Sequence, residues 1–474
     1  MKSEALKYIP VNLANILISF GTITILTRLL SAAEFGRYAL AITTLNFIHM
    51  GLFTWLEASM ARFHERASIK DSLNTHFKTI YLSAIGIAVA CLPLVFIAIY
   101  VFVLDGRLRL LLTFALVSIA IHLIYNLIQE GHKAAHRIAR YSTIHSTQLV
   151  LSFSIGIILV MFTPLKEAGP FLGMILGGAI AVLVEIPSLL NRIRGGHFDQ
   201  KIIREYFFYG TPICFSLVLA YALENGDLFF IKHFMNDQAV GAYSAGYNLA
   251  SRSFDFIFVW LSMAAMPVAI STLERKGKGY AKSVLSDYGD ILIMITLPAA
   301  VGIALVSKEA VIVLGEPVRA DALTIMPWVA IAALLNGFIT YYVHQAFVLA
   351  KKLNVLAAIM IVPVVINFGL NIIFIPKYGL LGAVIATLSA YTIALVITVI
   401  AARRVFTLPL PVMTFAKCAI ACAIMGFCIA IIPMNTNWPE VIKLFLKALI
   451  GAFIYGAVIY ILDTANIRKM VHFR

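Results

Sequence analysis

Long apolar stretches follow one another from Tyr8 to Asp463 with little between them, and this pattern fixes the solvent in which the chain folds. A helix needs roughly 20 apolar residues to cross a bilayer. Backbone groups find no water there, so each stretch must satisfy its own hydrogen bonds as a helix. Only 13% of the residues are charged and the mean hydropathy is +0.93, whereas a soluble domain carries about a quarter charged residues. The sequence therefore predicts an all-α polytopic membrane protein.

We count about fourteen transmembrane helices. Their approximate ranges are 8–30, 38–61, 79–103, 108–130, 141–162, 170–190, 206–231, 239–270, 288–306, 322–349, 354–375, 380–401, 411–433 and 441–462. The first is expected to be an uncleaved signal-anchor.

The basic residues test this count, because Lys and Arg concentrate in cytoplasmic loops. With the N-terminus inside, most of them fall in cytoplasmic segments, for example 62–78, 133–140, 192–204 and 275–282. We therefore expect both termini to lie in the cytoplasm. The net charge of +14 has the same origin, since these turns face anionic lipid. No aromatic-basic cluster indicates nucleic-acid binding.

The chain also repeats itself at a shift of about 205 residues. Gly36 and Tyr38 stand opposite Gly241 and Tyr243. Prolines and a glycine-containing helix start recur at similar shifts: Pro10 and Pro212, Pro93 and Pro298, and Pro170–Gly173 and Gly379–Gly382. Two six-helix halves in parallel orientation explain these matches, and in one class of transporter such halves alternate around a central site.

This repeat predicts three parts. Residues 1–200 form a first lobe of helices 1–6, and residues 201–404 form a second lobe of helices 7–12. Residues 405–474 add helices 13 and 14 and a cytoplasmic tail.

Polar residues recur at helical spacing inside several spans, so each set lies on one stripe of its helix. Charges facing lipid at mid-depth cost at least roughly 2.5–3.5 kcal/mol, so these groups are expected to face protein or water. The stripes are Asn46, His49 and Glu57; His122, Tyr125, Asn126, Gln129 and Glu130; Ser142, His145, Gln148 and Ser152; Tyr221, Glu224, Asn225 and Asp227; Asn248, Arg252 and Asp255; Asn336, Thr340 and His344; and Asn367 and Asn371.

Two readings stand for each candidate. Arg28 and Arg37 flank the first outer turn and either snorkel to the interface or line a cavity mouth. Arg252 and Asp255 lie one turn apart and either neutralise each other or act on substrate. A buried histidine such as His49 more often bonds a neighbouring helix than carries protons.

Glu224 and Asp227 are two carboxylates one turn apart, so one of them holds a proton if both are buried. That arrangement suits a proton or sodium site, whereas an Asp227 at the surface titrates normally. We assign candidate residues accordingly. Substrate binding is assigned to Arg28, Arg37, Asn46, His49 and Arg252, and ion coupling to Glu57, Glu224, Asp227 and Asp255.

Three segments resemble bacterial polysaccharide transporters, the oligosaccharide-lipid flippases of the multidrug/oligosaccharidyl-lipid/polysaccharide exporter superfamily. The segment 26–38 (LTRLLSAAEFGRY) is similar to their first helix-turn-helix. Asp227-Leu-Phe-Phe-Ile followed by Val240-Gly-Ala-Tyr243 is similar to helices seven and eight. The segment 375–383 (IPKYGLLGA), with Ala386-Thr387 and Ser389, is similar to the eleventh-to-twelfth turn.

The resemblance implies two six-helix lobes around a central cavity. It also implies a multi-pass protein of the bacterial inner (plasma) membrane that exports undecaprenyl-diphosphate-linked sugar units to the periplasmic face for O-antigen or exopolysaccharide synthesis. Cationic residues then meet the diphosphate, an H⁺ or Na⁺ gradient supplies drive, and a polymerase and a chain-length regulator are possible partners. Arg28 and Asp227 match motif positions of the family, whereas Arg252 has no secure match.

Other functions fit the sequence less well. No phosphate-binding Gly-x-x-x-x-Gly-Lys-Ser/Thr loop is present, so nucleotide hydrolysis is not the expected energy source. A membrane-embedded polymerase or ligase usually presents a large outer loop, and the longest outer segment here, about 307–321, is short. A drug-cation antiporter of related architecture typically has twelve helices. The five cysteines have no metal-binding or disulfide spacing, so we expect no metal or cofactor.

Overall fold

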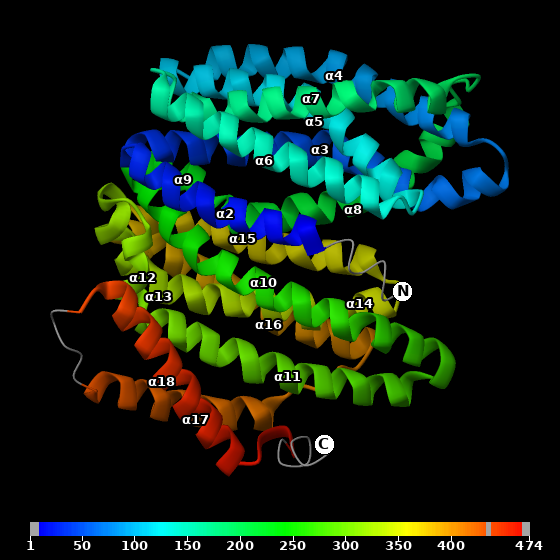
Figure 1. Cartoon of the computed structure of the whole chain (residues 1–474). Coiled ribbons are helices and arrows are strands. Elements are labelled where there is room, and N and C mark those ends of the chain that lie inside the picture. The colour runs from blue at the N-terminus through cyan, green and yellow to red at the C-terminus, as the bar shows by residue number, and fades with distance from the viewer. Residues whose placement is uncertain (1–8, 433–437, 467–474) are drawn as a thin grey trace. The chain divides into compact units, whose positions relative to one another are not determined.

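The computed structural model describes residues 9–432 and 438–466, and the regular structure within these residues is helical. Fourteen of the described helical segments are long and apolar enough to cross a membrane. This confirms the expected fold class and the expected number of spans (Figure 1). Large apolar side chains lie exposed along them, such as Leu17 at 70% and Phe453 at 78%, which suits a hydrocarbon environment and not water.

The chain divides into two compact units. Unit 1 comprises the residues up to Lys232 together with Asn236–Gly241, and unit 2 comprises His233–Met235 and the residues from Ala242 onward. Helix 200–225 thus belongs with unit 1, although the repeat places it at the start of the second lobe. The three-part division into 1–200, 201–404 and 405–474 follows the repeat and stays a prediction.

Unit 1 is a helical bundle. Its elements are α2 (Ile9–Leu29), α3 (Ala32–Ile69), α4 (Leu73–Phe102), α5 (Gly106–Ala134), α6 (Ile138–Phe162), the 3-10 turn η1 (Lys166–Ala168), α7 (Gly169–Ile193), α8 (Gln200–Asn225), most of α9 (Asp227–Phe234) and the first turn of α10. Helix α3 packs on α5 and α8, and α6 packs on α2 and α7.

Small residues allow α6 and α7 to approach closely. A Cβ added at Gly173 would collide with the Ser152 carbonyl oxygen, and one at Gly177 with the Ser152 hydroxyl. Small residues serve this purpose in membranes, because close backbone packing replaces the missing hydrophobic drive between helices.

Helix α3 is longer than its apolar stretch indicates. The sequence predicts 38–61, whereas the helix runs over Ala32–Ile69. Its start is fixed by a capping box, in which Ser31 accepts from the Glu34 N–H and Glu34 accepts from the Ser31 N–H. At 38 residues and about 1.5 Å per residue, it exceeds the roughly 30 Å hydrocarbon layer, so its polar last turns extend the helix beyond the apolar segment.

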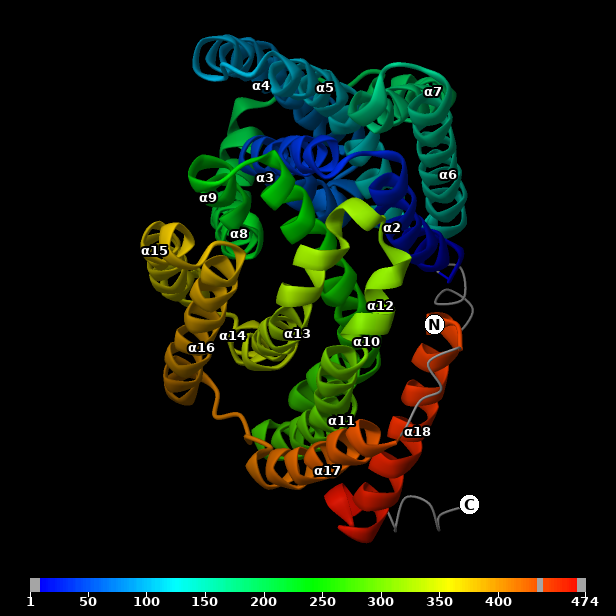
Figure 2. The same ribbon diagram turned by 90° about the vertical axis from the view of Figure 1, so that its left-hand side faces the viewer.

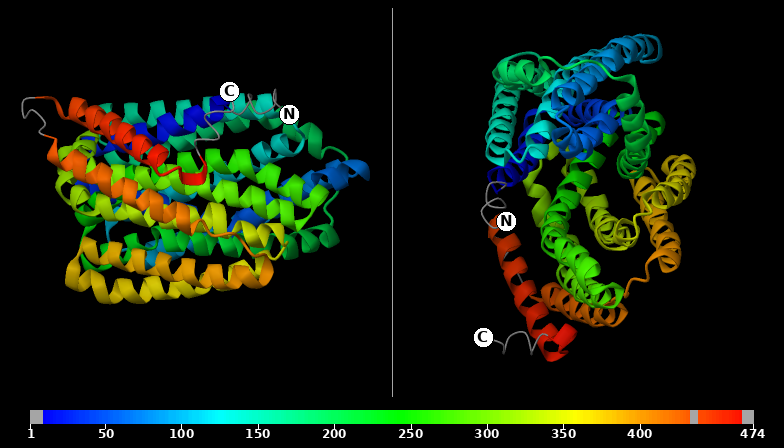
Figure 3. Two further views of the ribbon diagram at one scale, coloured as in Figure 1. Left: turned by 90° about the horizontal axis from the view of Figure 1, so that it is seen from below. Right: turned by 90° about the vertical axis from the view of Figure 1, so that its right-hand side faces the viewer.

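Unit 2 continues with paired long helices. Its elements are α10 (Asp237–Lys276) beyond its first turn, α11 (Lys278–Leu305), α12 (Ser307–Ala310), the 3-10 turn η2 (Val311–Val313), α13 (Glu316–Phe338), the π-helical turn η3 (Ile339–Val343), α14 (Gln345–Leu349), α15 (Leu353–Tyr378), α16 (Leu380–Val405), α17 (Val412–Ile431), α18 (Glu440–Ile461) and the 3-10 turn η4 (Thr464–Asn466). Figures 2 and 3 show α15 beside α16, and α17 beside α11.

Two backbone features shape unit 2. Gly379 joins α15 to α16 with φ of +59°, a left-handed conformation that glycine adopts without a Cβ penalty. Between α13 and α14 the Ile339 carbonyl accepts from His344 N–H at 2.8 Å, which closes a wide five-residue turn. Tyr288, Leu292, Tyr342 and Phe347 form part of the core around that turn.

Candidate functional site

Arg37 lies in a buried ion cluster at one end of unit 1, the end that carries turns 30–31 and 163–168 (hereafter the Arg37 end). Its Nη2 is 2.7 Å and its Nε 3.0 Å from Glu167 Oε1. Its Nη1 is 3.5 Å from Asp237 Oδ2, and Lys232 Nζ is 2.5 Å from Asp237 Oδ1. The guanidinium therefore joins three segments of the chain, which are α3, η1 and the first turn of α10.

Backbone contact reinforces this junction. A Cβ at Gly36 would collide with the Asp237 carbonyl oxygen, and a Cβ at Gly241 with the Ala32 carbonyl oxygen. The two glycines that the repeat places opposite each other thus meet in space. Arg28, the other predicted cation of this region, lies in the last turn of α2 with an exposed side chain.

The middle of α3 carries a hydrogen-bonded group built from three of the predicted residues. Nε2 of His49 lies 2.9 Å from Glu57 Oε1 and 3.2 Å from Asn126 Nδ2. Asn46 donates from Nδ2 to the Tyr221 hydroxyl at 3.0 Å. The sequence assigned His49 to substrate and Glu57 to ions, whereas the structure joins the two in one pair.

The protonation of His49 decides which partner it bonds. A protonated Nε2 donates to Glu57, whereas an unprotonated Nε2 accepts from Asn126. One nitrogen cannot do both at once. Nε2 therefore bonds only one of these two partners at a time.

Asp227 is completely buried at the first residue of α9. Glu224 lies in the last turn of α8 and is partly buried. Gly226 between the helices keeps helical angles, with φ −64° and ψ −27°, so the two carboxylates remain about one turn apart. The burial argues against a surface position for Asp227, and its role in ion coupling stays a prediction.

The remaining predicted pair lies in unit 2, on α10. Arg252 Nη1 is 3.8 Å from Asp255 Oδ2, and both side chains are about half exposed, at 49% and 47%. The neutralising pair is therefore present. An exposed pair at this distance holds its partners weakly, so it leaves Arg252 able to exchange Asp255 for another anion.

Unit 1 also contains a polar pocket of about 300 Å³ that the sequence did not single out. Its polar lining comes from two of the predicted stripes, on α5 and α6, and from Thr22 and Tyr38. The residues on these two helices are His122, Tyr125, Asn126, His145, Gln148 and Ser152. The stripes were the available signal, but only their packing against each other shows that they enclose a space.

A second cluster missed by the sequence surrounds Glu185 at the opposite end of unit 1, which carries turns 70–72 and 135–137 (hereafter the Glu185 end). The buried Glu185 accepts from His132 Nε2 at 3.1 Å and from Arg140 Nε at 2.8 Å. Arg192 Nη2 lies 3.2 Å from His132 Nδ1. One carboxylate thus organises the ends of α5, α6 and α7.

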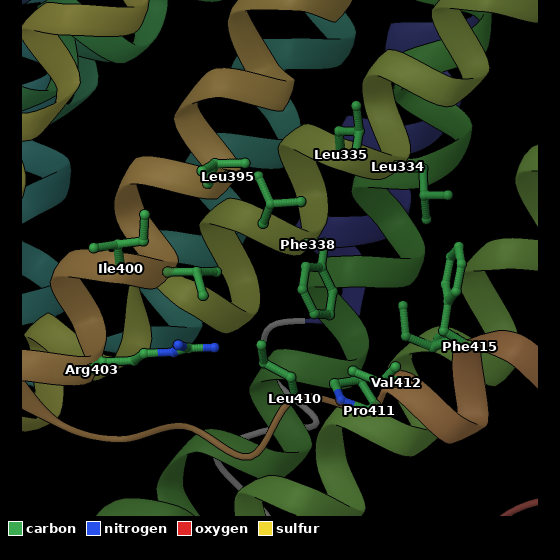
Figure 4. Close-up of a pocket in the computed structure, with 13 residues that line it drawn as sticks. Leu334, Leu335, Phe338, Leu395, Ile400, Arg403, Leu410, Pro411, Val412 and Phe415 are labelled. Atoms are coloured by element: carbon green, nitrogen blue, oxygen red, sulfur yellow. The ribbon is translucent and has the colours of Figure 1, made fainter.

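Unit 2 contains an apolar pocket of about 470 Å³ between α11, α13, α16 and α17. Figure 4 shows Leu334, Phe338, Leu395 and Phe415 around it, with Arg403 at its edge. Such a lining suits hydrocarbon. Within residues 9–432 and 438–466, no group of three or more His, Cys, Asp or Glu side chains is placed to hold a metal ion.

Comparison with solved structures defines the class of fold. The structure of the lipid II flippase MurJ in an inward closed conformation matches with a TM-score of 0.77 at 16% identity, over 98% of this chain and 100% of MurJ. An inward-facing multidrug resistance MATE family transporter of the MOP superfamily matches with a TM-score of 0.64 at 14% identity, over 82% of this chain and 95% of that one. The fold is therefore that of a MurJ- and MATE-like membrane protein.

The sequence comparison then gives the family. Residues 3–273 match the polysaccharide biosynthesis protein family. The chain belongs to this family, which confirms the resemblance that its motifs indicated. Probable flippase AglR of Haloferax volcanii is 24% identical over 248 residues, or 52% of this chain, and the match spans about half (51%) of AglR.

Proposed function

We propose that this protein is a flippase, and not an enzyme, that moves undecaprenyl-diphosphate-linked oligosaccharide units across the bacterial inner membrane. The main support is the hydrogen-bonded group of His49, Glu57 and Asn126, which lies within helices long enough to cross a membrane. The chain also belongs to the polysaccharide biosynthesis protein family. Polar groups at membrane depth are expensive and mark substrate or ion pathways. The names of AglR and MurJ support the same activity.

The direction of transport follows from the basic residues. The Glu185 end carries the cationic turns, so we place it and both termini in the cytoplasm and the Arg37 end at the periplasm. The diphosphate headgroup then starts at the Glu185 end and is released at the Arg37 end. A polymerase and a chain-length regulator are the partners that would receive the exported unit for O-antigen or exopolysaccharide synthesis.

Drive comes from an ion gradient in this proposal. One proton on His49 exchanges its hydrogen bond from Asn126 to Glu57, and the buried Asp227 with Glu224 supplies a second position for H⁺ or Na⁺. Inward movement of one charge releases roughly 2.3 kcal/mol per 100 mV. The lobes 1–200 and 201–404 would rock between the two access states as the site is occupied.

Arginine suits the diphosphate because its planar fork binds two phosphate oxygens at once. Arg252 and Arg28 are the candidates, since both side chains are accessible. Arg37 is the least suited of the three predicted arginines to bind a diphosphate, because its guanidinium already pairs with Glu167 and Asp237. Asn46, next to Tyr221, offers an amide to a sugar hydroxyl.

The test is a host strain that lacks the gene. We expect it to lose surface polysaccharide and to accumulate lipid-linked oligosaccharide at the cytoplasmic face, and the wild-type gene to reverse both effects. Glu57→Gln should restore at most about a tenth of the polymer, because it removes the negative charge that His49 Nε2 contacts. Glu65→Gln is the matched control, since Glu65 is an exposed residue of the same helix and should complement fully. A deletion strain with normal polymer would contradict the flippase.

A multidrug or cation antiporter is the second candidate, favoured by the likeness to the MATE transporter. The same strain separates the two functions. An antiporter predicts that deletion sensitises cells to cationic dyes while polysaccharide stays normal.

A further inference from the structure

We propose that the polar pocket of unit 1 binds a single neutral sugar ring. The identification of that ring as one residue of the lipid-linked oligosaccharide rests on the proposed function. Binding of a free monosaccharide does not, so the two claims can fail separately.

The pocket is built on a ladder of polar pairs between α5 and α6. Gln148 Nε2 lies 3.4 Å from His122 Nε2 and donates to Ser152 Oγ at 3.0 Å. The Tyr125 hydroxyl lies 2.8 Å from His145 Nδ1. The paired positions run antiparallel, so successive rungs face the same space. These bonds fix the side chains before any ligand arrives, which lowers the entropy that binding costs.

The polar groups of the lining carry no formal charge, and together they both donate and accept hydrogen bonds. Amide, hydroxyl and imidazole groups each donate or accept hydrogen bonds, as sugar hydroxyls do. None of the lining residues is Lys, Arg, Asp or Glu. A phosphate would find no cation there and a drug cation would find no carboxylate, and burying an unpaired charge is strongly unfavourable.

The rest of the lining is apolar and includes Leu26, Phe153, Ile157, Pro170 and Met174. A sugar ring presents hydroxyls at its rim and C–H groups on its face, so a lining that combines polar and apolar side chains matches it. Pockets with mostly apolar lining and a few placed polar groups are the usual small-molecule sites.

The size selects one ring. The pocket measures about 300 Å³, at the lower end of the roughly 300–1,000 Å³ typical of ligand sites. A single monosaccharide fits this space, whereas an oligosaccharide must leave its other residues outside. The pocket would therefore bind one sugar residue of a repeat unit.

The pocket shares a residue with the ion-coupling group. Asn126 lines the pocket, and its Nδ2 is 3.2 Å from His49 Nε2. A sugar hydroxyl that takes the Asn126 hydrogen bond releases His49 toward Glu57. Occupancy and the position of the His49 proton are thus linked through one amide.

Saturation-transfer NMR on the full-length protein in detergent tests the proposal. The probes are the methyl glycosides of glucose, galactose, N-acetylglucosamine and rhamnose. We expect at least one to show transfer with the wild type. Gln148→Leu and the shape-conserving Tyr125→Phe should each weaken its affinity by about 10-fold, because each change removes from the lining one group that can hydrogen-bond to a sugar hydroxyl. Gln200→Leu, at the exposed first residue of α8, should bind as the wild type does.

Three outcomes would overturn the proposal. One is no transfer from any of the four probes to the wild type. Another is transfer that is undiminished in both Gln148→Leu and Tyr125→Phe. The third is displacement of the sugar by tetraphenylphosphonium, which would make the pocket a cation site. Loss of sugar binding in Gln148→Leu with normal polysaccharide in cells would overturn the assignment of the ring to the transported molecule and leave the flippase standing. If the wild-type protein binds sugar but the deletion strain keeps normal polysaccharide, the flippase function is overturned and the sugar site stands.

Discussion

The two ends of α3 are held in different ways. At the Arg37 end, α3 meets the first turn of α10 through Gly36 and Gly241, and its cation is buried between two carboxylates. At the Glu185 end, α3 meets α8, where Arg66 forms a two-bonded pair with Glu205 at 2.6 and 2.7 Å, and both side chains are nearly half exposed.

If the protein opens at alternate ends as proposed, the two ends differ in what opening them costs. The Arg66–Glu205 pair already borders solvent, so parting it replaces each partner by water at little cost. The Arg37 cluster must take up water before its charges can separate, because an unpaired buried charge is strongly unfavourable. Opening at the Arg37 end therefore needs an event that hydrates it, such as entry of a polar headgroup.

Breaking the Arg37 cluster should give the largest effect. We expect Arg37→Ala to lower the free energy of unfolding by about 3–5 kcal/mol, because Glu167 is left buried and unpaired. Thermal unfolding of the whole protein in detergent measures it. Arg107→Ala is the control at the same end, since Arg107 is exposed and should change stability by less than about 0.5 kcal/mol. Equal stability of the two variants would mean that the Arg37 end is not held by charge.

The second-largest effect is expected at the contact between Gly36 of α3 and the first turn of α10. Gly36→Ala places a methyl group against the Asp237 carbonyl, and overpacking of this kind costs about 1–3 kcal/mol. Complementation by this variant should fall with its stability, because α3 and α10 cannot close. Gly51→Ala is the matched control, since it lies on the same helix with open space at the Cβ position. A fully stable and active Gly36→Ala protein would show that the helices close without touching there.

The smallest effect is expected at the Glu185 end. A double-mutant cycle of Arg66→Gln and Glu205→Gln should give a coupling of about 1 kcal/mol or less. That coupling should shrink further in 1 M salt, where screening acts within about 3 Å. Unfolding measured at low and high salt provides both numbers. A salt-independent coupling above about 2 kcal/mol would remove the contrast between the two ends.

The fold was largely predictable from the sequence, because crossing a bilayer requires about the same run of apolar residues in every helix. The residues at which helices begin and end were less predictable. The predicted span 38–61 lacks the last turns of α3. These turns are largely polar, yet they are helical, and Phe63 within them is buried and stacks on Tyr206. A hydropathy pattern sees the hydrocarbon layer and not the helix that continues beyond it.

The site was predictable as residue types on stripes but not as contacts. Arg37 and Glu167 are separated by 130 positions, and nothing local in the sequence shows that η1 returns to α3. His49 and Glu57 stand eight positions apart on one helix, about 12 Å along a regular helix axis, so their spacing alone did not predict that they pair. Glu185 carried no spacing signal, because its partners come from two other helices.

The wide turn over Ile339–Val343 has a consequence for how this chain tolerates changes in length. A turn of this kind takes up one residue more than an ordinary helical turn while the flanking stretches keep their facing. A copy of the chain shortened by one residue within 339–343 would therefore close into a regular helix and still direct α13 and α14 at the same neighbours. The same deletion in the middle of α16 would rotate everything after it by about 100°, so the two helices differ in their capacity to absorb an evolutionary deletion.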